Sequence, residues 1–171
     1  MTTDNLQPAT DNSLNIRFAK PEDVPEMLAM IRELAIYERE PEAAIATAED
    51  LLRDGFGPNP VFGCLIAEWE GKTAAMALYF SFYSTWRGNA GTHLEDLFVR
   101  PDFRRKGIAK ALFVRLAQIT LERGERFQWH VLDWNKPALD FYEQMGAHML
   151  NEWRIMRIDG EALKALAASG S

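Results

Sequence analysis

The sequence predicts an α/β (α+β) protein in which helices flank a single mixed, mostly antiparallel sheet. Strand-like and helix-like segments follow one another in the order β-α-α-β-β-β-α-β-α-β, and a short helix closes the chain. No internal repeat or second linker interrupts this series. With 171 residues, of which 47% are hydrophobic, the chain is long enough to bury a substantial core as one domain.

The N-terminal part of the chain predicts a tail, a strand and a helix. Residues 1–13 are polar and show no hydrophobic period, so we expect a disordered tail there and the folded domain over 14–171. Residues 14–19 alternate like a short strand, and Pro21 with two acids then opens a helix. Its apolar residues recur at helical spacing: Val24, Met27, Leu28, Ile31, Leu34 and Ala35.

A second helix and a hairpin come next. Thr47 and Asp50 have the spacing of a capping box, and Gly55 is expected to end the helix that they begin. Residues 61–69 and 73–84 read as two strands separated by the short turn "EGK", which predicts an antiparallel hairpin.

The second half alternates strands and helices. These elements are expected over 92–99 (strand), 108–123 (helix), 127–133 (strand), 137–145 (helix), 147–158 (strand) and 161–168 (helix). Gly124 and Gly146 stand where the first two of these helices should end.

Composition limits the partners of the chain. The net charge of -6 and the pI of about 5.1 argue against a general nucleic-acid binder, which needs a dense basic face. The single Cys64 has no intrachain partner, and its apolar neighbours predict a buried thiol on a strand. The N-terminus lacks the regions of a signal peptide, and no apolar run has the length of a membrane span. We therefore expect a soluble, cytoplasmic protein with no nucleic-acid or membrane partner.

Positive charge gathers around one glycine. Between Arg100 and Lys110 the chain carries five bases against the single acid Asp102. Gly107 lies where this loop becomes a helix, so free backbone N–H groups and the helix dipole add positive potential there. A small phosphate-bearing ligand fits this pattern, which is neither a Walker loop nor a dinucleotide fingerprint. A solvated charged turn would give the same local sequence.

The loop carries a family resemblance. Arg104-x-x-Gly107-x-Ala109 resembles the R/Q-x-x-G-x-G/A signature of GNAT acetyltransferases, in which this loop binds the pyrophosphate of acetyl-CoA. The strand "LEDLFV" precedes it, and "WNKPALDFYEQMGA" follows as in the second cofactor segment of that family. Stretches such as "IRELAIYE", "DLLRDGFG", "YSTW" and "VLDWN" resemble the spermidine/spermine and thialysine N-acetyltransferase branch over roughly residues 15–165. Ala109 stands where that branch usually has a second glycine.

The resemblance implies a GNAT fold that uses acetyl-CoA as cosubstrate, and it implies the residues that hold it. Backbone groups of the central strand would bind the acetyl and pantetheine portion, the loop would bind the pyrophosphate, and the later segment would contact pantetheine or adenosine. These residues are, in that order, Leu97, Phe98 and Val99; Arg104, Arg105, Lys106, Gly107, Ile108, Ala109 and Lys110; and Asn135 and Ala138. The three histidines and one cysteine show no metal-ligand spacing, so no metal is expected.

Two residues are candidates for proton transfer. Tyr142 matches the tyrosine that the family uses as general acid, and a phenol can protonate a departing thiolate. Packing beside Phe141 on an amphipathic helix is its alternative role. Glu95 is the candidate base, acting directly or through water on an amine that arrives protonated. Glu95 and Asp96 should point to opposite faces of their strand unless a bulge intervenes, and both are equally readable as solvated carboxylates.

The acceptor is expected to be a small cation. Residues 20–54 contain ten acids against four bases, although a solvated helix face has the same composition. The resemblance implies that the amine is bound by Arg32, Glu33, Tyr37, Trp86, Glu95 and Asp96. Polyamine-acetylating relatives tend to have an acid-Pro pair where this chain has Ser84 and Thr85.

This difference favours a thialysine- or lysine-like amino acid over spermidine, spermine or another diamine. Acetylation of protein lysines and acyl-CoA binding without turnover remain alternatives. Members of the branch commonly form dimers, so a homodimer is also expected.

Overall fold

The computed structural model describes residues 13–170, which form two compact units divided after His130. The tail predicted over 1–13 lies outside the described residues except for Ser13, whose carbonyl oxygen accepts a hydrogen bond from the Glu70 amide at 2.7 Å. Within the described residues, every helix is too short or too polar to cross a bilayer.

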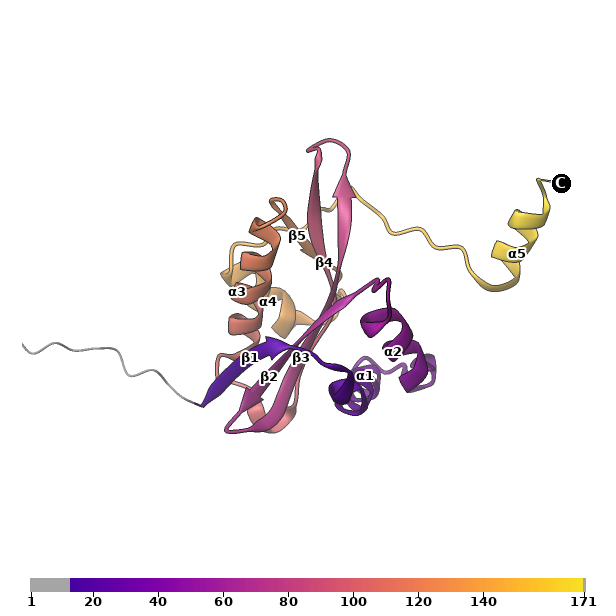
Figure 1. Cartoon of the computed structure of the whole chain (residues 1–171). Coiled ribbons are helices and arrows are strands. Elements are labelled where there is room, and N and C mark those ends of the chain that lie inside the picture. Colours follow the sequence, from indigo (N-terminus) through magenta and orange to yellow (C-terminus); the bar gives the residue numbers. More distant parts are fainter. Residues whose placement is uncertain (1–12, 171) are drawn as a thin grey trace, which may run out of the picture. The chain divides into compact units, whose positions relative to one another are not determined.

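The first unit is built on one five-stranded sheet (Figure 1). Its strands lie side by side in chain order: β1 (Leu14–Phe18), β2 (Gly63–Trp69), β3 (Lys72–Ser84), β4 (Asn89–Val99) and β5 (Arg126–Trp129). Neighbouring strands are antiparallel except for β4 and β5, which are parallel. The predicted mixed, mostly antiparallel sheet is therefore confirmed, and so is the β2–β3 hairpin, whose turn residues Glu70 and Gly71 both have positive φ.

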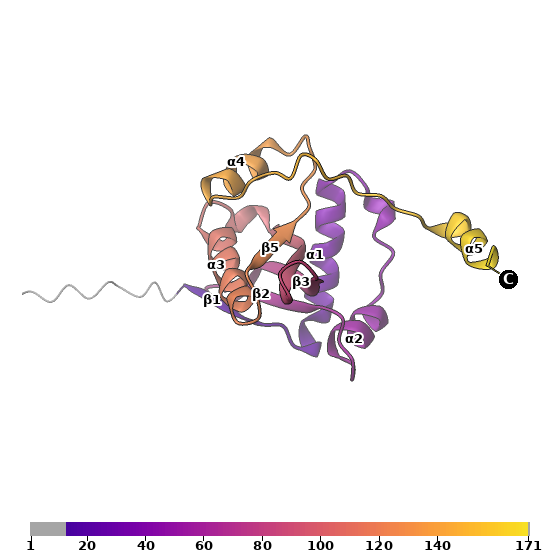
Figure 2. The same cartoon turned by 90° about the horizontal axis from the view of Figure 1, so that it is seen from above.

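Helices cover both faces of this sheet (Figure 2). The helices α1 (Val24–Tyr37) and α2 (Ala48–Phe56) pack on one face, and α3 (Ile108–Leu121) packs on the other. Three short 3-10 turns precede α1, α2 and α3: Pro21–Asp23, Pro41–Ala43 and Pro101–Phe103. The core under α1 and α2 includes Met27, Met30 and Cys64, and burial raises the pKa of the Cys64 thiol to about 12. Cys64 is thus the buried strand thiol that its neighbours predict.

The capping box of α2 is present, but its predicted end is wrong. The Thr47 hydroxyl accepts a hydrogen bond from the Asp50 amide, and the Asp50 carboxylate accepts one from the Thr47 amide. The helix continues through Gly55 to Phe56. A Cβ at Gly55 would lie 2.5 Å from the Phe62 ring, so this glycine makes room for an aromatic side chain.

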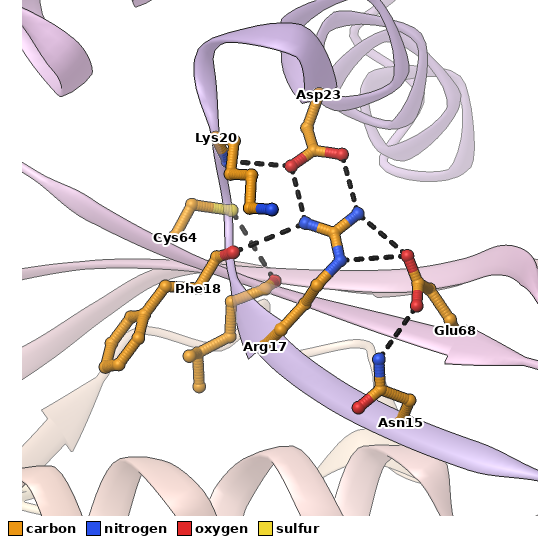
Figure 3. A network of polar contacts seen from close by, with 8 residues as sticks. Asn15, Arg17, Phe18, Lys20, Asp23, Cys64 and Glu68 are labelled. Atoms are coloured by element: carbon orange, nitrogen blue, oxygen red, sulfur yellow. Dashed lines mark hydrogen bonds and ion pairs between the residues drawn. The ribbon is translucent and has the colours of Figure 1, made fainter.

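One arginine joins the first strand to its neighbours (Figure 3). Arg17 on β1 donates to both carboxylate oxygens of Asp23 and to Glu68 on β2, and Asn15 donates to the same Glu68. The arginine therefore ties the edge strand β1 both to the 3-10 turn before α1 and to β2. It lowers the pKa of Asp23 through this bonding.

The second unit contains α4 (Lys136–Gln144) and α5 (Gly160–Ala168), close to the predicted helices. Gly146 at φ 88° follows the end of α4 as expected. The strand predicted over 147–158 is wrong, because this segment is a turn and irregular backbone. The strand predicted over 127–133 also ends early, at Trp129. Apolar alternation produces a strand only where another strand completes its hydrogen bonds, and within the described residues neither 147–158 nor 131–133 has such a partner.

Candidate active site

The basic loop ends in free backbone donors. Gly107 caps α3 in the left-handed region at φ 77°, and Arg105 two residues earlier also has positive φ, at 62°. The first intrahelical hydrogen bond runs from the Ala111 amide to the Gly107 carbonyl oxygen, at 3.0 Å. Within residues 13–170 the amides of Ile108, Ala109 and Lys110 have no acceptor. Consecutive free amides at a helix start form a concave site for an anion.

Two cations of this loop are held by neighbouring side chains and backbone. The Arg104 Nε donates to the Val99 carbonyl oxygen at 3.1 Å, and its guanidinium lies 5.5 Å from the centre of the Tyr37 ring. The Lys106 Nζ lies 4.8 Å from the centre of the Trp69 ring. Arg104 therefore links the loop to the end of β4 and to α1, while Arg105 and Lys110 are exposed to solvent.

The edge of β4 opens beside this loop. Pairing between β4 and β5 covers only Gly91–Leu94 on the first strand and Arg126–Trp129 on the second. Within the described residues, Glu95–Val99 has no strand partner on that edge. The backbone of Leu97, Phe98 and Val99, predicted to bind the donor, thus lies on the open part of the strand and leads directly into the loop.

A β-bulge brings two carboxylates together on β4. Leu78 of β3 pairs with Asp96 and the next residue, Tyr79, pairs with Leu94, so Glu95 is the extra residue. Successive side chains of a regular strand point to opposite faces of the sheet, but a bulge lets two of them approach the same site. Asp96 is partly buried, and burial, followed by the nearby Glu95 and Glu38, raises its pKa to about 6. Glu38, at the end of α1, is a third acid of this cluster that the sequence did not reveal.

Comparison with known proteins identifies the family. The profile described as "Acetyltransferase (GNAT) family" matches residues 25–147. This chain belongs to the GNAT acetyltransferase family.

Relatives and solved structures agree with this assignment. The acetyltransferase is 41% identical over 167 residues to thialysine N-epsilon-acetyltransferase of Sus scrofa, covering 91% of this chain and 98% of the relative. It is 30% identical to L-ornithine N5-acetyltransferase of Arabidopsis thaliana, covering 88% of this chain and 86% of that one. An integron cassette protein of V. cholerae superposes with a TM-score of 0.77 at 25% identity, covering 91% of this chain and 98% of that structure. The predicted GNAT fold and acetyltransferase class are confirmed.

The donor of this family fits the residues present. A GNAT enzyme uses acetyl-CoA, and its diphosphate suits the free amides of α3 and the exposed bases of the loop. A Cβ built on Gly107 meets no atom within 4 Å, so the backbone is open to a ligand at this point. Among the described residues, no group of three His, Cys, Asp or Glu side chains is arranged to hold a metal ion.

In this acetyltransferase, Glu33 is bound by Arg100, the first residue of the basic loop. The Arg100 Nη2 lies 3.0 Å from a Glu33 oxygen, and its Nη1 donates to Glu26 at 2.7 Å and to the Thr73 carbonyl oxygen at 3.2 Å. Glu33 and Glu26 are therefore held by a cation from the end of β4. Because these residues lie on different elements, only the folded chain reveals the pairing.

The remaining predicted acceptor residues are dispersed. Arg32 is exposed on α1, and Tyr37 lies beneath Arg104. Trp86 is 84% exposed in the turn between β3 and β4. The strand from Asn89 to Asp96 spans roughly 23 Å at about 3.3 Å per residue, so the turn carries Trp86 away from the acid cluster.

Three predicted residues of the acetyltransferase lie together in the second unit. The Asn135 Oδ1 caps α4 by accepting a hydrogen bond from the Ala138 amide at 3.4 Å. Tyr142 is on the same helix, half-buried, with its ring centre 5.5 Å from that of Phe141. Asn135, Ala138 and the candidate acid Tyr142 thus all belong to the short helix α4 or its cap.

Proposed function

We propose that this acetyltransferase transfers acetyl from acetyl-CoA to the side-chain amine of a small cationic amino acid, thialysine- or lysine-like. The observation that carries the proposal is an acid cluster beside the basic loop: Glu95 and Asp96 lie on β4, the strand that leads into this loop, and Glu38 approaches them from the end of α1. Apart from Asp102, residues 95–110 thus carry acids first and bases afterwards. The acids attract the cationic amine, and the bases attract the anionic diphosphate of the donor.

Each step of the reaction has a candidate residue. Acetyl-CoA supplies an acetyl group as a thioester, and a backbone N–H of Leu97–Val99 hydrogen-bonds to its carbonyl oxygen. Asp96 attracts the ammonium group of the acceptor. Glu95 removes one of its protons, directly or through a water molecule, so that the amine lone pair can attack. Tyr142, assigned by family resemblance, donates its phenolic proton to the leaving sulfur, and the second proton that the attacking nitrogen loses restores the phenol.

The charge distribution supports an amino-acid acceptor over a polyamine. An extended polycation is favoured by several separated carboxylates, but Glu26 and Glu33 are already paired with Arg100. Of the acids predicted to bind the acceptor, Glu95 and Asp96 remain, and with Glu38 they form one compact cluster that matches one ammonium group. The relatives that are named for thialysine and ornithine acetylation support the same class of acceptor.

We also propose that the enzyme is a cytoplasmic homodimer. Acetyl-CoA is an intracellular metabolite, and the family branch that the sequence resembles commonly forms dimers. Exposed apolar side chains along the second unit support an interface: Met149, Leu150, Trp153, Ile155, Met156 and Ile158. A solution mass of twice the 19.5 kDa of one chain is expected. A monomeric mass at micromolar concentration would reject the dimer.

The acceptor is tested by comparing amines directly. The purified chain is incubated with acetyl-CoA and thialysine, lysine, ornithine, spermidine or spermine, and thiol release is measured with an amine-free control. We expect kcat/KM to be at least about tenfold higher for the best amino acid than for either polyamine, a difference of about 1.4 kcal/mol in transition-state binding. A preference for spermidine would support the polyamine alternative. Acetyl-CoA binding without amine-dependent thiol release would support a non-catalytic binding module.

A further inference from the structure

Beside Glu95 lies an imidazole that the proposed mechanism does not use. His93 is two residues earlier on β4, and its Nε2 lies 3.6 Å from the Glu95 Oε2. The His93 side chain is only 7% exposed, whereas the Glu95 side chain is 55% exposed. A buried imidazole is therefore in contact with a carboxylate that is accessible to solvent and ligands.

The His93 ring is held by contacts on several sides. It stacks on Phe80 of β3 with ring centres 4.8 Å apart and an interplanar angle of 24°. His130, just after β5, meets it edge-on at 4.8 Å. The Gln128 carboxamide lies 3.5 Å from Nδ1, and a carboxamide has both a donor and an acceptor, so it suits either neutral tautomer of the ring.

Burial and two neighbouring side chains set the protonation state of His93. Burial lowers its pKa, His130 on the β5 side lowers it further, and the Glu95 carboxylate opposes both. Asp96 on β4 and Glu38 at the end of α1 are the other acids of this cluster. His93 is thus mainly neutral at pH 7 and has a free nitrogen lone pair, and imidazole is ordinarily a stronger base than a carboxylate.

We propose that His93 is a positioning residue that orients the Glu95 carboxylate and receives, through it, the proton lost by the acceptor amine. The inference rests on the proposed acetyl transfer and adds a second proton acceptor to it.

In this relay, an ammonium N–H bond breaks and its electron pair remains on nitrogen for the attack. The proton forms an O–H bond on Glu95 and then passes to the Nε2 lone pair of His93, which becomes imidazolium. After the transfer the proton returns through the exposed carboxylate to water. The 3.6 Å gap is closed by a small rotation of Glu95 or by one water molecule.

The kinetic test uses His93→Gln, which fills similar space and does not titrate, with His148→Gln on the exposed surface of the second unit as the matched control. The rate constant kcat/KM for the best amine is measured from about pH 6 to about pH 9.5, a range that spans the titration of imidazole and approaches that of a primary amine. We expect His93→Gln to lose about tenfold at pH 7 and less than about threefold at the alkaline end, where more of the amine arrives neutral.

Three outcomes separate the hypotheses. An equal fractional loss at every pH, or no loss, overturns the relay while the wild-type activity keeps the proposed function. No amine-dependent turnover by the wild type overturns both. If KM for acetyl-CoA changes as much as kcat, His93 has only a structural role, which also overturns the relay.

A second measurement does not depend on turnover. The chain has three histidines, so the ring nitrogen signals of His93 can be assigned by comparing the His130→Gln and His148→Gln proteins. We expect Glu95→Gln to move the NMR titration midpoint of His93 to lower pH and His130→Gln to move it to higher pH, because a carboxylate favours the imidazolium and a second histidine disfavours it. A midpoint that does not respond to Glu95→Gln would show that the two side chains are not coupled, and the relay would be rejected.

Discussion

The guanidinium of Arg100 binds the carboxylate of Glu33, which lies 67 positions earlier in the chain. The Arg100 Nε lies 3.2 Å from both Glu33 oxygens, and its Nη1 donates to Glu26, which lies nearer the start of the same helix α1. The contact ties α1 to the point where β4 becomes the anion-binding loop. Because Glu26 and Glu33 are already paired with Arg100, they are less available to bind a cationic acceptor.

Replacing Arg100 tests the contribution of this contact. Arg100→Ala leaves the partly buried Glu33 and the exposed Glu26 without their cation, so the free energy of unfolding is expected to fall by about 1–2 kcal/mol, mostly through Glu33. Lys164→Ala, which breaks the exposed pair with Glu161, is the control and should change it by less than about 0.5 kcal/mol. Urea unfolding at pH 7 measures both. Equal losses would mean that Arg100 is no more than a surface ion pair.

Asp96 should make stability depend on pH. Its pKa is raised to about 6, so the folded state holds this proton more tightly than the unfolded state, and the ionised carboxylate destabilises the fold. This cost is absent below the ordinary pKa of aspartate, grows as pH rises to about 6 and is constant above it. Asp96→Asn is therefore expected to be more stable than the wild type at pH 7, by at most about 3 kcal/mol, and similar to it near pH 4.

The same substitution should abolish most amine acetylation, because the ammonium group loses its partner. Urea unfolding and thiol release at several pH values test the two effects on the same protein. A stability difference that is constant from acid to neutral pH would show that Asp96 does not titrate as described.

Substituting two glycines with similar backbone conformations distinguishes the effect of backbone strain on stability from an effect on acetyl-CoA binding. Gly107 has φ 77° and Gly88 has φ 68°, and a Cβ on either meets no atom within 4 Å. Gly107→Ala and Gly88→Ala should each cost about 1 kcal/mol of stability, because alanine disfavours this conformation. Only Gly107→Ala should weaken acetyl-CoA binding, by about tenfold, since its methyl group enters the space in front of the loop amides. Calorimetric titration with acetyl-CoA measures the dissociation constants of both variants. Equal affinities of the two variants would show that the diphosphate does not bind at the loop amides.

Tyr142→Phe tests the proposed acid. The substitution keeps the ring on α4 and removes the proton donor, so kcat should fall by about a hundredfold or more. The dissociation constant for acetyl-CoA should stay within about twofold, because hydroxyl removal leaves packing intact. Tyr83→Phe, on the exposed part of β3, is the control and should have wild-type kinetics. Unchanged turnover in Tyr142→Phe would assign the proton to another group.

Local patterns predicted most elements of this acetyltransferase. Thr47 and Asp50 formed the expected capping box, and Gly146 ended α4, because these signals act within a few residues. The segment 147–158 alternated like a strand but has no partner strand in the described chain. A strand depends on hydrogen bonds to distant residues, so alternation alone was insufficient.

The sequence by itself determined the family and the basic loop around Gly107, and it predicted the proton donor and acceptor, since each depends on residue types at short spacing. Only the tertiary structure decided which charges meet. It paired Arg100 with Glu33, placed Glu38 beside Asp96 and, through a bulge in β4, brought Glu95 close to Asp96. Electrostatic interaction depends on distance in space and on burial, and both arise when helices pack on the sheet.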